Sequence, residues 1–268
     1  MGQPAVAITG LGFSYAARSG FLKSSSPGYS SPKSSPAAPG RLFEGLELEI
    51  AEGLRFGLFG PNGAGKTTLM HLMTGILSYD QGSIELFGHR VKTKNKIVNS
   101  LFGLVPQDFS FYEELTPVEN LEFFGAWAGL TPRETRQRTE ELLEVMNLKE
   151  VRNKAVGQFS GGMKRKVNLA IGVIHQPRIL FLDEPTVGVD VYTRHELIRY
   201  LIELNKKGTT LVYTSHQLDE AEELCQRIAL IDKGKIIACD DLEVLLAEHS
   251  QKGLEGLFLH LTGDAFEK

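Results

Sequence analysis

No stretch of this sequence is both apolar and long enough to cross a lipid bilayer. A transmembrane helix needs about 20 consecutive apolar residues, and apolar runs such as ILFL at 179–182 are far shorter. The first residues also lack the cationic start and long apolar stretch of a signal peptide. Val6 stands where a myristoylation motif has Ser or Thr. These absences predict a cytoplasmic protein.

Cysteine is nearly absent, and so is any excess of positive charge. Cys225 and Cys239 are the only two cysteines, and their spacing fits neither a metal site nor a CxxC motif, which favours reduced thiols in the cytosol. The 29 Lys and Arg stand against 33 Asp and Glu, a balance that argues against broad binding to nucleic acid. With 42% hydrophobic and 23% charged residues, the chain is otherwise an ordinary globular sequence.

Short apolar or β-branched runs alternate with helical patterns over most of the chain. The runs LRFGLFG at 54–60, ILFLD at 179–183 and TTLVYTS at 209–215 are typical of central strands in a parallel sheet. Each leads toward a helix, so the predicted fold class is α/β. Two earlier strands are expected within 5–15 and 42–50, and in the second of these apolar and acidic residues alternate from Leu46 to Ile50.

Two segments depart from this alternation. Residues 18–41 are dense in Ser, Pro and Gly and have too few apolar groups to offset the entropy lost on ordering, so we predict a flexible loop there. From about residue 107 to residue 165 the pattern becomes purely helical. Two capping boxes with proline at the first helical position mark helix starts, TPVE at 116–119 and TPRE at 131–134. We expect a helical subdomain inserted into the α/β core.

The end of the sequence is expected to be simpler. RIALIDKGKIIACD at 227–240 has Lys-Gly between two apolar runs, which indicates a late hairpin. The pattern over 241–268 predicts one amphipathic helix and a short tail. We therefore expect a main domain over 1–240 followed by a small C-terminal segment.

The segment GPNGAGKT at 60–67 fits the P-loop pattern G-x-x-x-x-G-K-[ST], between a strand pattern and a helical pattern. Its glycines allow successive backbone N–H groups to bind phosphates, and the following helix directs the positive end of its dipole at them. Lys66 is expected to reach the β- and γ-phosphates, and Thr67 to ligate Mg²⁺. A glycine-rich turn without a ligand is the alternative, which the flanking elements disfavour. The candidate phosphate-binding residues are Gly60, Pro61, Asn62, Gly63, Ala64, Gly65, Lys66, Thr67 and Thr68.

Two adjacent carboxylates follow the apolar run at 179–182. A P-loop enzyme needs a carboxylate at the end of a buried strand to hold Mg²⁺, and Asp183 is in that position. Because neighbouring carboxylates repel each other in a dry site, we expect both to have a role. Glu184 is predicted to act as the base or positioner for an attacking water. A strand ending at a solvated acidic turn is the alternative interpretation.

A second anion site is indicated by FSGGMKRK at 159–166. A serine and two glycines that open onto a helix can form a backbone nest for an anion. The three cations that follow, Lys164, Arg165 and Lys166, are interpreted as a solvated helix face.

Together these segments resemble the motifs of the nucleotide-binding subunits of ATP-binding-cassette (ABC) transporters, in the expected order over roughly residues 5–240. GPNGAGKTT resembles the Walker A loop, ILFLDEP the Walker B segment, and FSGGMKRK the signature, usually written LSGGQ. Gln107 in VPQDF matches the Q-loop, and Asp190 in TVGVD the D-loop. His216 in TSHQLDEAEEL matches the switch histidine, and Tyr15 the aromatic residue that stacks on adenine.

The resemblance implies a P-loop NTPase (RecA-like) core with a mostly parallel sheet, an N-terminal antiparallel β region, and an ATPase that uses ATP and Mg²⁺. In this family two subunits enclose two ATP molecules head to tail. Ser160, Gly161 and Gly162 are therefore expected to bind the γ-phosphate of ATP held by the P-loop of a second subunit, either a copy of this chain or a homologous ATPase. The implied residues for hydrolysis are Glu184, His216, Gln107 and Lys66, and those for Mg²⁺ are Thr67, Gln107 and Asp183.

The other implied partner is a membrane permease, through which the protein would lie at the inner face of the plasma membrane. Phe109, Phe111 and Tyr112, beside the Q-loop, are interpreted as a docking groove for it, with a role in the core as the alternative. Met163, where the signature usually has glutamine, resembles the branch that works with ABC-2-type export permeases. Besides Met163, the long loop after Tyr15 is a second departure from the usual pattern of the family.

Two other functions stay open. Soluble ABC ATPases of translation or DNA repair usually carry tandem cassettes, long coiled-coil insertions or basic arms, none of which this sequence has. A catalytically silent cassette that acts as a nucleotide-gated interaction protein tends to lose one of two residues, and both Glu184 and His216 are present here. The leading prediction is an ATPase subunit that powers a separate permease.

Overall fold

The computed structural model describes residues 3–15, 41–92, 95–215 and 217–263. Nearly all of the loop predicted at 18–41 lies outside these ranges, and so does His216. The predictions for that loop and for the histidine therefore remain predictions.

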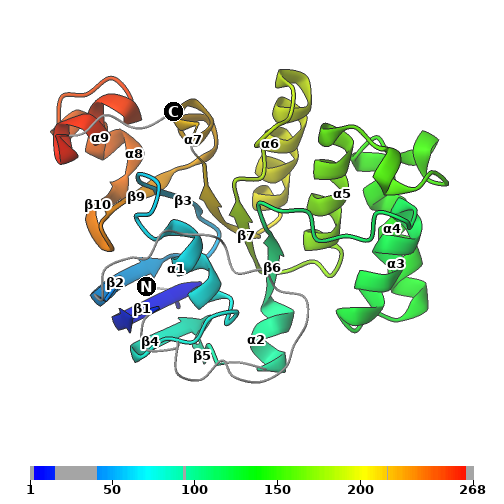
Figure 1. Cartoon of the computed structure of the whole chain (residues 1–268), viewed down its shortest axis with the longest axis horizontal. Helices are drawn as coiled ribbons and strands as arrows, with labels where there is room; N and C mark the ends of the chain where they lie inside the picture. Colours follow the sequence, from blue (N-terminus) through cyan, green and yellow to red (C-terminus); the bar gives the residue numbers. More distant parts are fainter. Residues whose placement is uncertain (1–2, 16–40, 93–94, 216, 264–268) are drawn as a thin grey trace.

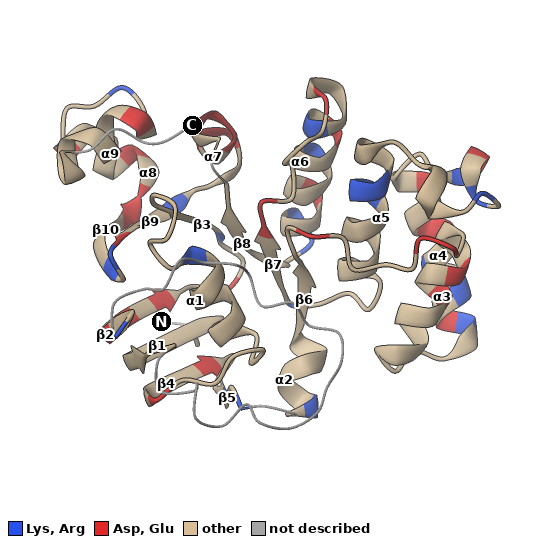
Figure 2. Cartoon of the chain, in the orientation of Figure 1, with Lys and Arg blue, Asp and Glu red and all other residues tan. Residues whose placement is uncertain are grey.

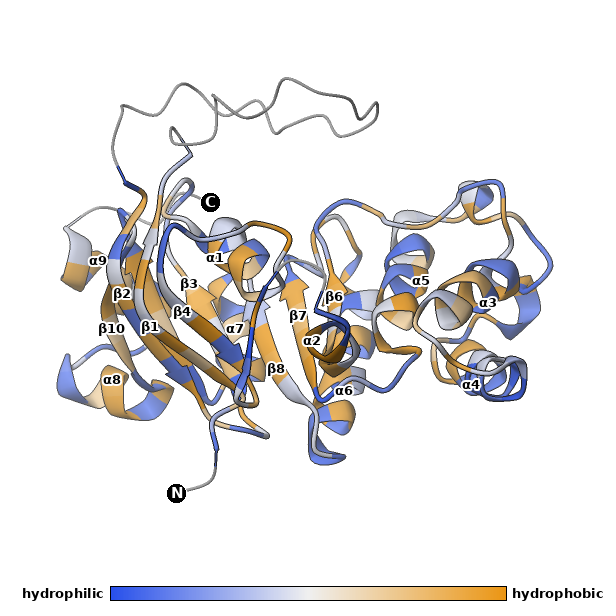
Figure 3. Ribbon diagram, turned by 90° about the horizontal axis from the view of Figure 1, so that it is seen from below, coloured by the Kyte–Doolittle hydropathy of each residue, from blue (hydrophilic) through white to orange (hydrophobic). Residues whose placement is uncertain are grey.

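The larger sheet has six strands in the order β10-β9-β3-β8-β7-β6 (Figure 1). All neighbouring pairs are parallel except β9 and β10, which form the predicted late hairpin. The three apolar runs of the sequence lie in its middle as β3, β7 and β8, as Figure 3 shows by hydropathy. The strands are β3 (Arg55–Phe59), β6 (Phe102–Val105), β7 (Ile179–Asp183), β8 (Thr210–Thr214), β9 (Arg227–Asp232) and β10 (Lys235–Asp241).

The smaller sheet is antiparallel throughout, which confirms the predicted N-terminal β region. Its order is β2-β1-β4-β5, with β1 (Val6–Phe13), β2 (Phe43–Ile50), β4 (Gln81–Leu86) and β5 (His89–Arg90). In β2 the apolar residues Leu46, Leu48 and Ile50 are buried, and the residues between them are exposed. This alternation gives the sheet one apolar face, which must be covered.

Two hydrophobic cores cover the two faces of the larger sheet. Ile179 and Phe181 of β7 belong to the core shared with the smaller sheet and α1 (Lys66–Met73). Leu180 and Leu182, on the other face, belong to the core shared with α6 (Val191–Lys206) and the helical region. Since side chains of a strand alternate between faces, the first four residues of β7 are all apolar, and its carboxyl end at Asp183 lies between two packed layers.

The segment with the two capping boxes is helical, and it lies at the opposite end of the molecule from the smaller sheet (Figure 1). Thr116 and Thr131 each cap a helix by accepting a hydrogen bond from the backbone N–H three residues later, and each has the reciprocal glutamate. Both acidic and basic residues lie on α4 and α6 (Figure 2). The helices of this region are α3 (Pro117–Trp127), α4 (Pro132–Val145) and α5 (Gly161–Val173), with short 3₁₀ turns at Lys149–Val151 and Val156–Gln158.

The C-terminal segment differs from the prediction of one helix. It contains two, α8 (Leu242–Glu248) and α9 (Leu254–Thr262). The chain breaks because Leu254 N–H donates to Glu222 Oε1 at 2.6 Å, on α7 (Leu218–Leu224), and Leu257 and Phe258 are buried. The amphipathic pattern was correct, and contact with α7 divided it.

The remaining helix is α2 (Lys96–Leu101).

Within the part of the chain that the structure describes, no helix combines the length and the apolar character that crossing a membrane requires.

Candidate functional site

The predicted P-loop connects β3 to α1, as its pattern requires. Gly65, the residue before the helix, has a φ of 111°, a left-handed conformation that suits glycine. Gly60 is constrained by space, because a Cβ there would lie 2.0 Å from the carbonyl oxygen of Ile231. The start of α1 has no side-chain cap among the described residues. Its first N–H groups can therefore bind an anion.

Lys66 is buried at the centre of this loop. Its Nζ donates to the carbonyl oxygens of Gly60 at 2.7 Å and Pro61 at 3.1 Å. Burial lowers the pKa of the Lys66 ammonium, and the charges of Glu184 and Asp183 act in the opposite direction. A buried cation held by two neutral carbonyls gains from an incoming phosphate charge. Thr67, the next residue, is exposed.

The two predicted carboxylates lie where β7 ends, and both are buried. Thr214 Oγ1, at the end of β8, donates to Asp183 Oδ1 at 2.7 Å. Glu184 has a φ of 50°, an uncommon conformation for a residue with a side chain. Such positions are often found at functional sites. The structure thus brings the P-loop lysine and both carboxylates into one buried region.

The pKa of Glu184 is raised, first by burial and then by the charge of Asp183, while Lys66 and Arg165 oppose the shift. A carboxylate with a raised pKa is a better proton acceptor than an exposed one. Gln107 Nε2 donates to Glu184 Oε2 at 3.1 Å, although the two residues are 77 positions apart. The structure therefore joins the predicted Q-loop residue to the predicted base.

Tyr15 lies over the start of α1. Its hydroxyl is 2.8 Å from Thr68 Oγ1, and its ring contacts Phe13 edge-on with centroids 4.8 Å apart. The side chain is 54% exposed. An exposed aromatic ring at this place is available to a planar group bound next to the P-loop.

The predicted signature residues lie away from the P-loop in the same chain. Ser160 and Gly161 are exposed at the start of α5, and Ser160 Oγ accepts from Met163 N–H at 3.3 Å. Helix α5 contacts β6 and α6, whereas α1 contacts β4 and β7 (Figure 1). The chain therefore has two separate glycine-rich helix starts.

Asp190, the predicted D-loop residue, lies next to the signature through Thr193. It caps α6 by accepting from Thr193 N–H at 3.0 Å and Thr193 Oγ1 at 2.7 Å, bonds that lower its pKa. A Cβ on Gly162 would come within 3.0 Å of the same Thr193 hydroxyl oxygen. Position 162 therefore favours glycine because α5 packs closely on α6.

The interpretation of the three cations after the signature as a solvated face is wrong for Arg165. Arg165 is only 4% exposed, and its guanidinium donates to the carbonyl oxygens of Gln107 at 2.9 Å and Val187 at 3.2 Å. Lys164 and Lys166 form ion pairs with Glu113 and Glu196. The helical spacing of Gly162, Arg165 and Leu169, all buried in α5, carried the missed signal.

A second buried group was also missed. Glu220 Oε2 accepts from Thr186 Oγ1 at 2.5 Å and Tyr213 Oη at 2.6 Å, and Arg194 Nη1 lies 3.6 Å from Glu220 Oε1. Through Glu220, the loop after Glu184 is hydrogen-bonded to α7, and α7 is joined to β8 by a hydrogen bond and to α6 by an ion pair. No local sequence pattern predicts these contacts, because the residues come from α6, β8, α7 and the loop after β7.

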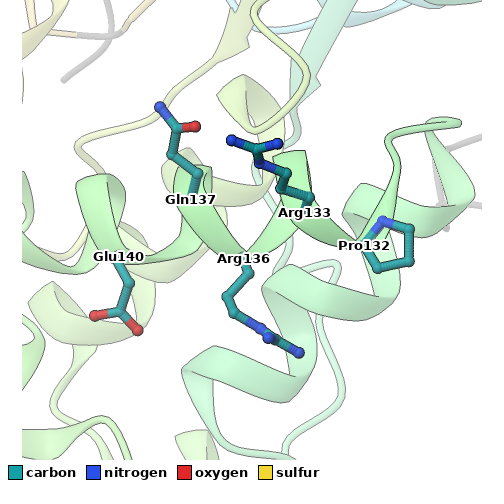
Figure 4. Close-up of a pocket in the computed structure, with 5 residues that line it drawn as sticks. All are labelled: Pro132, Arg133, Arg136, Gln137 and Glu140. Carbon is teal, nitrogen blue, oxygen red and sulfur yellow. The ribbon is translucent and has the colours of Figure 1, made fainter.

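A shallow hollow on α4 is separate from all of these residues. It is lined by Pro132, Arg133, Arg136, Gln137 and Glu140. Figure 4 shows the side chains of Arg133 and Arg136 pointing in different directions. They do not converge on a common ligand position.

Comparison with known proteins shows the family of the chain. A family profile described as "ABC transporter" matches residues 43–187. The linearmycin resistance ATP-binding protein LnrL of Bacillus subtilis (strain 168) is 40% identical over 197 residues, which are 74% of this chain and 63% of that protein. The Nod factor export ATP-binding protein I of Rhizobium sp. (strain N33) is 37% identical over 205 residues, 76% of this chain and 67% of that protein. The chain thus spans less than two thirds of the first of these relatives.

The fold is shared with a solved structure described as the ATP binding subunit of an ABC transporter. The two superpose with a TM-score of 0.81 and 25% sequence identity, over 96% of this chain and 99% of the other.

Proposed function

This chain belongs to the ABC transporter family, and we propose that it is an ATP-hydrolysing subunit that energises a separate membrane permease in the direction of export. The observation that carries the proposal is the meeting of three distant segments, the P-loop lysine, the carboxylates after β7 and Gln107. The direction of export is supported by Met163 in the signature and by the similarity to a Nod factor export protein.

Each residue has a defined task in this proposal. The N–H groups at the start of α1 and the Lys66 ammonium bind the phosphates, and the ring of Tyr15 stacks on the adenine. Glu184 accepts a proton from the attacking water, and its bond to Gln107 orients the carboxylate. His216 is proposed to contact the γ-phosphate.

The residues proposed for Mg²⁺ offer the oxygen ligands that this ion prefers. Thr67 has an exposed side chain, Asp183 is fixed by its bond from Thr214, and Gln107 presents an amide from the facing segment. Bound there, Mg²⁺ would neutralise phosphate charge. The donor set fits the ion.

A second subunit completes the site in this proposal. The exposed start of α5 lies apart from the P-loop of its own chain, so Ser160, Gly161 and Gly162 are free to bind the ATP of another subunit. Asp190 and the two residues after it, Val191 and Tyr192, are exposed at the start of α6. We propose a head-to-tail dimer of this chain or of this chain with a homologous ATPase.

The permease is proposed to dock on the aromatic cluster beside the Q-loop. Phe109 is 40% exposed and Tyr112 is 47% exposed, whereas Phe111 packs partly into the core. Tyr112 also contacts Phe123 of α3 edge-on. Exposed neighbouring aromatic side chains are typical of protein interfaces.

The test is ATP hydrolysis by the purified chain with Mg²⁺, compared with Glu184→Gln. The amide cannot accept the proton, so we expect the rate to fall by about 100-fold or more, and the variant to accumulate as an ATP-bound dimer measurable by size. Glu243→Gln, an exposed glutamate on α8, is the matched control. Near-parental hydrolysis by Glu184→Gln would disprove the assignment, and co-purification with ribosomes or DNA instead of a membrane protein would disprove the transport role.

A further inference from the structure

Arg165 joins two loops that belong to different parts of the proposed ATPase. Its Nη1 donates to the carbonyl oxygens of Gln107 at 2.9 Å and Pro106 at 3.4 Å, and its Nη2 donates to the carbonyl oxygen of Val187 at 3.2 Å. Val187 lies between Glu184 and Asp190 in the chain. One rigid guanidinium on the signature helix therefore holds both the Q-loop and the loop that leads to Asp190.

The Q-loop is fastened to α5 at further points. Asn168, almost one turn after Arg165, accepts from Ser110 N–H at 3.1 Å and donates to the Pro106 carbonyl at 3.2 Å. The guanidinium also lies 4.8 Å from the centre of the Phe109 ring. The main chain from 106 to 110 must therefore follow any movement of α5.

The same short segment reaches the catalytic carboxylate. The main chain of Gln107 is bound by Arg165, and its side chain donates to Glu184 at 3.1 Å. A shift of the start of α5 would thus be passed through Arg165 and Gln107 to Glu184. The Nε of Arg165 is buried and has no hydrogen-bond partner among the described residues.

We propose that Arg165 is a positioning residue that couples the two nucleotide sites in which one chain takes part. The inference rests on the proposed head-to-tail dimer. When Ser160 and Gly161 bind ATP held by the second subunit, α5 moves, and Arg165 carries that movement to Gln107 and Glu184 beside the ATP of its own chain. Coupling of this kind needs a connected element that both sites can bias.

Arginine suits this role better than lysine. The guanidinium presents its donors in a fixed planar fork, so it can span two loops at once, whereas an ammonium is a point charge on a flexible stem. Replacement by lysine therefore keeps the charge near Glu184 but removes the bridge. This difference separates positioning from simple electrostatics.

The chain offers a matched control at the other end of α5. Arg138 of α4 donates to the carbonyl oxygens of Ile174 and Val173, both at 3.3 Å. It also donates to backbone carbonyls at the end of this helix, but none of its hydrogen bonds to the described residues reaches the Q-loop or the loop before Asp190. Arg138→Met should loosen the helical region without breaking the proposed connection.

The experiment measures phosphate release against ATP concentration for the parent, Arg165→Met, Arg165→Lys and Arg138→Met. We expect both Arg165 variants to lose about tenfold in kcat and to show a Hill coefficient near one, as loss of coupling requires. Their KM for ATP should stay within about threefold of the parent, because ground-state contacts at the P-loop are intact. Arg138→Met should keep the parental kcat and Hill coefficient. Arg165→Lys keeps the positive charge and the aliphatic part of the side chain, so it replaces Arg165→Met in the test if that variant does not fold stably.

A second readout does not depend on turnover. Amide hydrogen exchange over 106–110 in the nucleotide-free chain should rise by about tenfold in the Arg165 variants, and stay parental in Arg138→Met.

Three results would overturn the inference. These are a kcat within about twofold of the parent together with an unchanged Hill coefficient in Arg165→Met, full recovery in Arg165→Lys, or equal losses in Arg138→Met. If the parent neither hydrolyses ATP nor dimerises, the proposed function fails and this inference fails with it. An active, dimeric parent with an unaffected Arg165→Met overturns this inference alone.

Discussion

The P-loop and the signature are both glycine-rich segments that open a helix, but they are built for different situations. At the P-loop, the start of α1 has no side-chain cap among the described residues, and a buried lysine lies inside the loop. At the signature, Ser160 caps α5 through its own hydroxyl, and Gly161 is exposed. The first segment has a buried lysine and an uncapped helix start that an anion would satisfy, whereas the helix start of the second is capped by its own serine and faces outward.

This difference shows how one chain can hold a complete phosphate site and half of another. A helix start capped by a side chain is stable without a bound ligand, so the signature can stay exposed until a second subunit binds. An uncapped start beside a buried cation favours phosphate at once. The comparison can be tested in four ways.

The glycines of the two segments should respond differently to a methyl group. In Gly60→Ala the new Cβ would meet the Ile231 carbonyl oxygen at 2.0 Å, so we expect a loss of about 3 kcal/mol in the free energy of unfolding. In Gly161→Ala the nearest atom lies at 3.4 Å, and the change should be about 0.5 kcal/mol or less. Urea unfolding followed by circular dichroism measures both. Equal effects would mean that the enclosure of the P-loop is not what distinguishes it.

Removal of the P-loop cation should strongly weaken ATP binding by a single chain, and removal of the signature serine should not. Lys66→Ala is expected to weaken ATP binding by about 100-fold, near 3 kcal/mol, since a buried charge partner of the phosphates is lost. Ser160→Ala should leave the dissociation constant of the monomer unchanged. Isothermal titration calorimetry with ATP gives both dissociation constants. Mg²⁺ is left out so that ATP is not hydrolysed during the titration. A similar loss in Ser160→Ala would place the signature in the site of its own chain.

Mixed dimers sharpen the same comparison. A Lys66→Ala chain and a Ser160→Arg chain are each expected to be inactive, but a dimer of the two has one composite site with both lesions and one with neither. ATPase activity should therefore reappear on mixing, at a level below that of the parent. If mixed dimers are shown to form but the mixture has no ATPase activity, the result would contradict the sharing of ATP sites between subunits, unless both sites must be intact together.

The smallest effect is expected at Tyr15, at the edge of the enclosed site. Tyr15→Ala should weaken ATP binding by about fivefold, because stacking is worth about 1 kcal/mol. Tyr15→Phe keeps the ring and loses only the bond to Thr68, so its dissociation constant should be close to the parental one. An unchanged constant in Tyr15→Ala would remove Tyr15 from the adenine site.

Most local elements could be predicted because their signals lie within a few residues. Both capping boxes were correct, since the threonine, the proline and the reciprocal glutamate are sequence neighbours. The prediction of one C-terminal helix was wrong, because the bond that divides it comes from Glu222, 32 positions before Leu254. For Arg165 the helical spacing of α5 could have predicted burial, but not its partners at Gln107 and Val187, which are remote in the sequence.

The sequence by itself determined the α/β alternation, the P-loop turn and the position of two carboxylates after an apolar strand. These depend on side-chain period, glycine conformations and capping, which are properties of adjacent residues. Only the tertiary structure decided that Gln107 meets Glu184, that Arg165 holds two loops, and that the signature stands apart from the P-loop. Those pairings depend on the order in which strands lie side by side and on how helices pack against them, and no local pattern encodes a hydrogen bond between residues 77 positions apart.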